Sequence, residues 1–201
     1  MDRRLTQRGT ARKRQLMTFA AARFAEHGYH PTSVAEIVKG LGVGKGVFYW
    51  YFSSKEELFL EILRDAQHDL RRTQKAAIND LDDPILRIEH GIRASMLWSA
   101  EHRDLANLFQ FATTEERFAH SLRKGQEIAV ADAARHVKDA IAEGRVPDAD
   151  PVMLAHAILG VTRELAKTFI HERAEDSEAV ATAAVEFCLG GLLGRRDLRG
   201  D

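Results

Sequence analysis

The sequence contains one cysteine, Cys188, and four prolines among its 201 residues. A lone cysteine excludes an intrachain disulfide, so the fold must be stable without one. No apolar run approaches the roughly 18 residues that a membrane span requires, and no apolar run follows the first arginines as it does in a signal peptide. We therefore expect a cytoplasmic protein.

Signals for catalysis and for metal binding are also missing. The histidines are dispersed, without the close His, Cys and acid spacing that holds a metal. No Ser-His-Asp arrangement, phosphate-binding loop or dinucleotide fingerprint is present. We expect no metal site and no cofactor, and we expect that the protein is not an enzyme.

What the chain does have is enough apolar sequence for a packed core, at 45% of residues. The apolar positions recur at helical spacing, and the alternation typical of strands is scarce. We therefore predict an all-α fold of about nine helices.

The net charge of −1 hides an uneven distribution. Residues 1–55 carry ten Lys and Arg against three Asp and Glu, whereas the rest of the chain carries nineteen against twenty-seven. A basic end on an acidic body is typical of a segment that binds a polyanion. A solvated basic tail is the alternative interpretation of the same charges.

The segment from Ser33 to Leu58 reads SVAEIVKGLGVGKGVFYWYFSSKEEL. Ser33 is a helix cap with an acid three residues later, which is the pattern of a capping box. A glycine-bearing turn follows, and a further helix is expected over Lys45–Tyr51. Together with a helix that ends near Gly28, these elements predict a helix-turn-helix in which Phe48 and Phe52 face the core.

Aromatic and cationic side chains are concentrated on and just after this last short helix, at Lys45, Tyr49, Trp50, Tyr51 and Lys55. Two tyrosines two residues apart on a helix cannot share one buried face. Tyrosine hydroxyls and lysine ammonium groups suit contacts to the phosphate backbone. The segment therefore predicts DNA binding.

A resemblance extends this prediction. The positions that carry it are Gly28-Tyr29, Ser33, Ile37, Gly42-Val43, Gly46, Phe48-Tyr49, Tyr51-Phe52 and Lys55-Glu56-Glu57-Leu58. Over residues 12–62, close to a quarter of the chain, the sequence resembles the DNA-binding domain of the TetR family of bacterial transcriptional regulators. The resemblance implies a homodimer that places two such domains in successive major grooves of double-stranded DNA, with a helical body that binds a small effector.

The resemblance also implies individual roles. Ser33, Tyr49, Tyr51 and Lys55 stand at phosphate-contacting positions, and Lys45, Val47 and Trp50 stand where recognition-helix side chains can face bases. Gly44 replaces the commoner serine cap, and Val47 replaces a frequent threonine or alanine. Two hydroxyls are thereby lost, so base recognition is expected to depend on Lys45 and on apolar contacts with thymine methyls.

We predict a helix-turn-helix domain over residues 1–54 and a helical effector-binding and dimerisation domain over residues 55–201. Five large side chains of the second domain are candidates for an effector pocket: Met96, Trp98, Phe109, Phe111 and Phe118. Trp98 is the strongest of them, because a buried indole N–H needs a partner. The alternative is that all five belong to the ordinary core.

The last two helices are predicted to form the dimer interface as a four-helix bundle. The glycines at 190, 191 and 194 are unfavourable within a helix, which suggests close backbone approach there or a fraying end. The expected contributors are Leu159, Leu165, Leu189 and Leu192. Intrachain core is the alternative for these leucines.

The function predicted from the sequence is a ligand-responsive transcriptional regulator. We expect a repressor that a small, largely apolar effector releases from a near-palindromic operator. A regulator without an effector, controlled by a protein partner or by its own abundance, is the second possibility. A helical enzyme with a basic lobe is disfavoured because no catalytic constellation is present.

Overall fold

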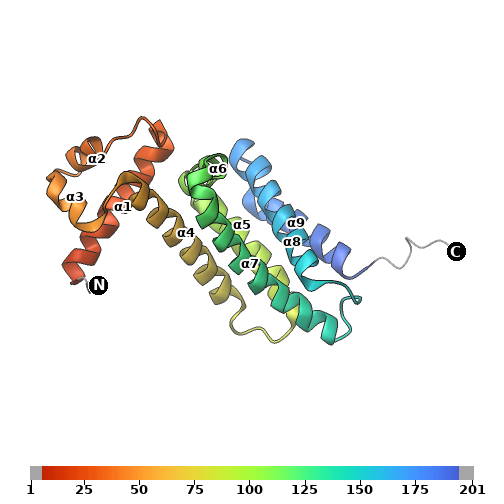
Figure 1. Cartoon of the computed structure of the whole chain (residues 1–201). Helices are drawn as coiled ribbons and strands as arrows, with labels where there is room; N and C mark the ends of the chain where they lie inside the picture. The colour runs from red at the N-terminus through yellow and green to blue at the C-terminus, as the bar shows by residue number, and fades with distance from the viewer. Residues whose placement is uncertain (1–5, 195–201) are drawn as a thin grey trace. The chain divides into compact units, whose positions relative to one another are not determined.

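The computed structural model describes residues 6–194, and every regular element within them is helical (Figure 1). The elements are α1 (Gln7–His27), α2 (Val34–Gly40), α3 (Lys45–Tyr51), α4 (Lys55–Ile78), α5 (Pro84–Glu101), α6 (Arg103–Thr114), α7 (Glu116–Ala142), α8 (Pro151–Leu165), the π-helical segment η1 (Ala166–Glu172) and α9 (Ser177–Leu192). The predicted all-α fold is confirmed. None of these helices combines the length and the apolar composition that a membrane span requires.

The helices form two compact units. The first unit contains the described residues up to 67 together with 104–121, and the second contains 68–103 together with the described residues from 122 onward. Both units are therefore discontinuous in sequence, whereas the predicted boundary after residue 54 treats the chain as two consecutive domains. The helix-turn-helix shares its unit with α6 and with the start of α7.

The turn between α2 and α3 depends on two glycines. Gly40 ends α2 against α1, and a Cβ atom at this position would lie 2.2 Å from Cζ of Phe19. Gly42 adopts a φ of +64°, a backbone conformation that side-chain-bearing residues rarely tolerate. Gly40 and Gly42 thus permit the short turn between α2 and α3 that the sequence predicts for a helix-turn-helix.

The core of the first unit is an aromatic cluster around Tyr29. The ring centroid of Tyr29 lies 5.5 Å from that of Phe24, 4.9 Å from Phe59, 5.4 Å from Phe111 and 5.3 Å from Phe118. Phe111 and Phe118 come from α6 and α7, so this cluster joins those helices to the helix-turn-helix. Offset and edge-to-face aromatic pairs each stabilise by about 0.5–1.5 kcal/mol beyond their buried area.

The second unit has an aliphatic core formed by α5, α7, α8, η1 and α9. Its buried members include Ile88, Ile92, Val137 and Ile170. Aspartates cap three of these helices, because Asp83, Asp150 and Asp176 accept hydrogen bonds from backbone N–H groups of α5, α8 and α9. Prolines follow the first two caps at 84 and 151, where the missing N–H costs nothing.

Removal of the Phe118 ring is predicted to destabilise the first unit strongly. Phe118 is completely buried, so Phe118→Ala leaves a cavity and is expected to cost about 3–5 kcal/mol of unfolding free energy. Urea unfolding followed by circular dichroism measures this loss. Tyr49→Ala, at a side chain that is 56% exposed, is the control and is expected to cost about 1 kcal/mol or less. Equal losses in the two variants would contradict the cluster's role.

Candidate nucleic-acid interface and cavity

Helix α3 presents one buried face and one exposed face. Phe48 is fully buried, whereas Tyr49 and Trp50 are 56% and 53% exposed. Lys45 is also exposed, and Val47 and Tyr51 are half-buried beside this exposed face. Large aromatic side chains left in solvent next to a lysine suit a surface that meets phosphates and base edges.

Ser33 and Gly44 differ as helix caps. The Ser33 hydroxyl accepts a hydrogen bond from the backbone N–H of Glu36 at 3.1 Å, which confirms the predicted cap. Ser33 is exposed, so its own O–H proton remains available to a phosphate. Gly44, at the start of α3, makes no side-chain capping bond. The N-terminus of α2 therefore has a side-chain hydroxyl as its cap, and the N-terminus of α3 has none.

Lys55 opens α4 and turns its ammonium group inward. Its Nζ donates to the backbone carbonyl oxygens of Tyr29 at 2.7 Å, Thr32 at 2.8 Å and His30 at 3.3 Å. The same atom lies 4.3 Å from the centroid of the Tyr29 ring. Partial burial, and then the charge of Arg117, lower the pKa of Lys55. All three N–H donors thus have partners within the protein, and the predicted contact to phosphate stays a prediction.

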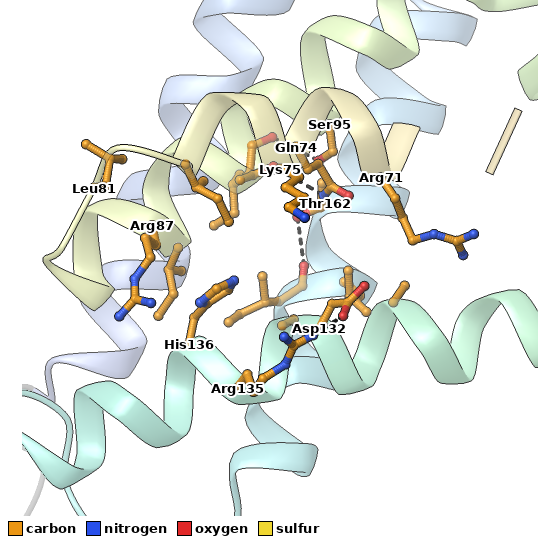
Figure 2. A pocket seen from close by; sticks show the side chains of 18 of the residues that line it. Arg71, Gln74, Lys75, Leu81, Arg87, Ser95, Asp132, Arg135, His136 and Thr162 are labelled. Atoms are coloured by element: carbon orange, nitrogen blue, oxygen red, sulfur yellow. Dashed lines mark hydrogen bonds and ion pairs between the residues drawn. The ribbon is translucent and has the colours of Figure 1, made fainter. Parts of the chain in front are cut away.

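A cavity of about 430 Å³ lies in the second unit. It is bounded by α4, the segment after it, α5, α7 and α8 (Figure 2). Isoleucine, leucine and alanine side chains make up much of its wall, at positions 78, 81, 88, 92, 129, 133, 158 and 159. A cavity of this size, with both apolar and polar side chains in its wall, falls within the size range of small-molecule sites.

Most uncharged polar groups of the cavity wall are already hydrogen-bonded to backbone. The hydroxyls of Ser95 and Thr162 donate to carbonyl oxygens of their own helices, at 2.9 and 2.8 Å. The Gln74 amide donates to the Gly91 carbonyl at 3.4 Å. These groups therefore add little unsatisfied polarity to the wall.

Two nitrogen atoms of the wall differ from the rest. Arg87 Nε and His136 Nδ1 are buried, and neither has a hydrogen-bond partner among residues 6–194. Burial, and then the charges of Arg87 and Arg135, lower the pKa of His136, so this ring is neutral near pH 7. A buried donor without a partner costs free energy unless a ligand or water satisfies it.

Cationic side chains surround the same cavity. Arg71, Lys75, Arg87 and Arg135 line it, whereas Asp132 is the only acid among its lining residues (Figure 2). Arg135 pairs with Asp132, and Arg87 pairs with Asp139 at 3.2 Å. Within the described part of the chain, Arg71 and Lys75 have no ion-pair partner.

The five predicted pocket residues lie elsewhere, since none of them lines the cavity. Phe111 and Phe118 pack on Tyr29, and Met96 is fully buried in the core of the second unit. The Trp98 indole N–H donates to Asp69 at 2.8 Å, so it has the partner that a buried tryptophan requires. Phe109 is half-buried on α6.

The four predicted interface leucines are partly or fully covered within the chain. Leu192 belongs to the core of the second unit, and Leu165 and Leu189 pack against it. Leu159 lines the cavity. The large apolar side chains that α8, α9 and the residue after α9 leave exposed are instead Val152, Met153, Phe187 and Leu193.

Comparisons with known proteins agree with this geometry. The family model for bacterial regulatory proteins of the tetR family matches residues 16–62, which span most of α1 through the start of α4. Over this segment the chain carries the DNA-binding domain of the TetR family. The resemblance inferred from Ser33, the glycine-bearing turn and the aromatic helix is therefore confirmed.

Relatives match the helical body as well. The HTH-type transcriptional regulator YdgC of Bacillus subtilis is 26% identical, over 92% of this chain and 95% of its own length. The transcriptional repressor KstR2 of Mycobacterium tuberculosis is 30% identical over 53% of this chain and 59% of its own length. The transcriptional regulator FadR of Bacillus subtilis, solved in complex with stearoyl-CoA, shares the fold with a TM-score of 0.81 at 19% identity, covering 89% of this chain and 98% of its own.

The cavity residues Arg87 and His136 were not predicted from the sequence. Neither side chain carries a local signal, because the cavity forms only where α4, α5, α7 and α8 meet. No group of three or more His, Cys, Asp or Glu within residues 6–194 is arranged to hold a metal ion.

We predict that Lys55 contributes substantially to the stability of the first unit. Lys55→Met leaves three backbone carbonyls without their donor and is expected to cost roughly 1–3 kcal/mol of unfolding free energy. Thermal unfolding of the DNA-free protein measures this cost. Lys45→Met, on the exposed face of α3, is the matched control and should leave the melting temperature unchanged. An unchanged melting temperature in Lys55→Met would show that these bonds contribute nothing.

Proposed function

We propose that the protein is a ligand-responsive transcriptional repressor that binds operator DNA through α3 and the N-terminal end of α2. The observation that carries the proposal is the exposed cationic and aromatic face of α3 within a TetR-family helix-turn-helix. Repression as the direction of control matches the repressor KstR2 among its relatives, whereas the relative FasR of Mycolicibacterium smegmatis is an activator.

The exposed or half-buried positions of these side chains support a proposed role for each of them. Lys45, Val47 and Trp50 face base edges, where a lysine can donate to guanine and an apolar side chain can contact a thymine methyl. Ser33, Tyr49 and Tyr51 contact phosphates and fix the register of the helix on the duplex. Lys55 remains a candidate for phosphate binding, although its ammonium group holds the backbone around Tyr29 in the free protein.

The cavity of the second unit is the proposed effector site. Its apolar wall fits the small, largely apolar effector predicted from the sequence, and the five pocket candidates at 96, 98, 109, 111 and 118 do not line it. FadR in complex with stearoyl-CoA supports an acyl compound as one such effector. Effector binding lowers the population competent for DNA, and linkage requires DNA to weaken effector binding by the same factor.

The protein is proposed to act as a homodimer through α8 and α9. The support is the exposed apolar set of Val152, Met153, Phe187 and Leu193, of which Phe187 is 69% and Met153 is 64% exposed. Phenylalanine and methionine are enriched in protein interfaces. A dimer would present two α3 helices to half-sites about 34–36 Å apart, one turn of DNA.

The DNA proposal is tested by selecting bound sites from random duplexes. We expect a near-palindromic sequence with half-sites one helical turn apart. Lys45→Met should relax the preference at one base position, whereas Tyr49→Phe should weaken binding to all sequences alike, since it removes a phosphate contact. Arg64→Met, an exposed change on α4 outside this surface, is the control. If no sequence is enriched at low salt, the proposal is wrong.

The dimer proposal is tested by placing a charge in the exposed apolar set. Phe187→Glu is expected to convert the dimer to a monomer, because an unpaired carboxylate in an interface is costly to desolvate. Analytical ultracentrifugation measures the mass of the species in solution. Ile128→Glu, at a 40% exposed apolar residue on α7, is the matched control and should leave the dimer intact. A Phe187→Glu protein that is still dimeric would place the interface elsewhere.

A further inference from the structure

We propose that the effector is an organic anion, with its acidic group at Arg87 and His136 and its apolar body against Ile88, Ile92 and Leu159. The inference rests on the proposed function, because it assigns a chemical class to the ligand of the proposed effector site. Its basis is the distribution of donors, charge and apolar surface around the cavity in the second unit.

The two unpaired nitrogens show where an acidic group would be held. Arg87 Nε always carries a proton, and this buried donor has no acceptor within residues 6–194. His136 Nδ1 is a second buried nitrogen in the same wall without a partner in that part of the chain. A carboxylate or phosphate oxygen can accept from Arg87 Nε, and from His136 Nδ1 in the tautomer that carries its proton there. Hydrogen bonds to charged groups are roughly twice as strong as neutral ones.

The charge of the wall favours an anion over a neutral or cationic ligand. Asp132, the acid that lines the cavity, pairs with Arg135, and Asp139 pairs with Arg87. Arg71 and the exposed Lys75, both on α4, add two positive charges and have no ion-pair partner within the described part of the chain. A cation in this cavity would therefore meet the like charges of α4.

The rest of the wall suits a hydrocarbon chain. Isoleucine, leucine and alanine side chains come from α5, α7 and α8, and the hydroxyls of Ser95 and Thr162 are occupied by carbonyl oxygens of their own helices. Burial of an apolar chain here is favourable by about 25 cal/mol per Å² of area removed from water. The complementary ligand is amphipathic, with an acidic group at one end and an apolar chain at the other.

Two sources can supply this chemistry. A free fatty acid offers a carboxylate, and a coenzyme A thioester offers phosphates together with an acyl chain. In both cases oxyanions meet Arg87 and the chain meets the apolar wall. Matched pairs of probes separate the two sources from each other and from a neutral amphiphile.

The first experiment uses the wild-type protein on its selected operator, with four probes below their micelle concentrations. Dodecanoate and dodecanol share a chain and differ in charge, and dodecanoyl-CoA and coenzyme A share phosphates and differ in the chain. Fluorescence anisotropy measures release from DNA, and thermal unfolding measures binding. We expect dodecanoate or dodecanoyl-CoA to act at concentrations at least about tenfold lower than dodecanol or coenzyme A.

The second experiment removes the proposed contacts one at a time. Arg87→Met and His136→Phe are each expected to weaken the response to the active anion by about tenfold to a hundredfold, and to affect the response to dodecanol much less. Lys138→Met is the matched control, since it removes one positive charge from an exposed position on α7 outside the cavity. Release is expressed relative to each variant's own DNA affinity without ligand. His136→Phe serves independently if Arg87→Met does not fold.

The outcomes separate the anion proposal from the proposed function. Equal responses to dodecanol and dodecanoate would overturn the anion proposal alone, since an effector site would still exist. An anion response that Arg87→Met and His136→Phe leave intact would also overturn it. If no probe changes DNA binding or thermal stability, the cavity is not an effector site for these ligands, and the anion proposal fails along with that part of the proposed function. If the wild-type protein without any probe does not bind operator DNA, the proposal that it is a transcriptional regulator is contradicted instead.

Discussion

The packing of aromatic rings around Tyr29 is the interaction on which the first unit depends. Tyr29 follows the end of α1, and its ring meets Phe59 of α4, Phe111 of α6 and Phe118 of α7. Burial raises the pKa of the Tyr29 hydroxyl. The Lys55 ammonium group lies over the same ring and ties its backbone to the start of α4. Cation–π attraction and dense packing thus act on one side chain.

The outer face of α3 does not contribute side chains to this core. Because Phe48 and the cluster supply the buried contacts, Tyr49 and Trp50 can remain exposed for a partner. In the second unit, Ile88 and Ile92 form part of the wall of a cavity in which Arg87 Nε and His136 Nδ1 lack hydrogen-bond partners within residues 6–194. On α3 the buried residue and the candidate binding residues are different side chains, whereas Ile88 and Ile92 belong both to the core of the second unit and to the cavity wall.

Local signals made much of the fold predictable from the sequence. The Ser33 cap and the span of α3 depend on neighbouring residues, and both are confirmed. The contacts of Phe111 and Phe118 with Tyr29 join residues more than 80 positions apart, so no periodicity indicates them. The cavity was unpredictable for the same reason, because it exists only where four helices meet.

The discontinuity of both units has a consequence for how such a protein can be divided or recombined. The chain passes between units three times, inside α4, at the start of α6 and inside α7, so no single cut separates a complete DNA-binding unit from a complete body. A fragment that ended near residue 67 would lack Phe111 and Phe118 and would expose the rings that they cover. A chimaera that takes its helix-turn-helix from a relative therefore has to take the segment 104–121 from the same relative. Otherwise the aromatic residues that pack between the two segments have to be redesigned to fit each other.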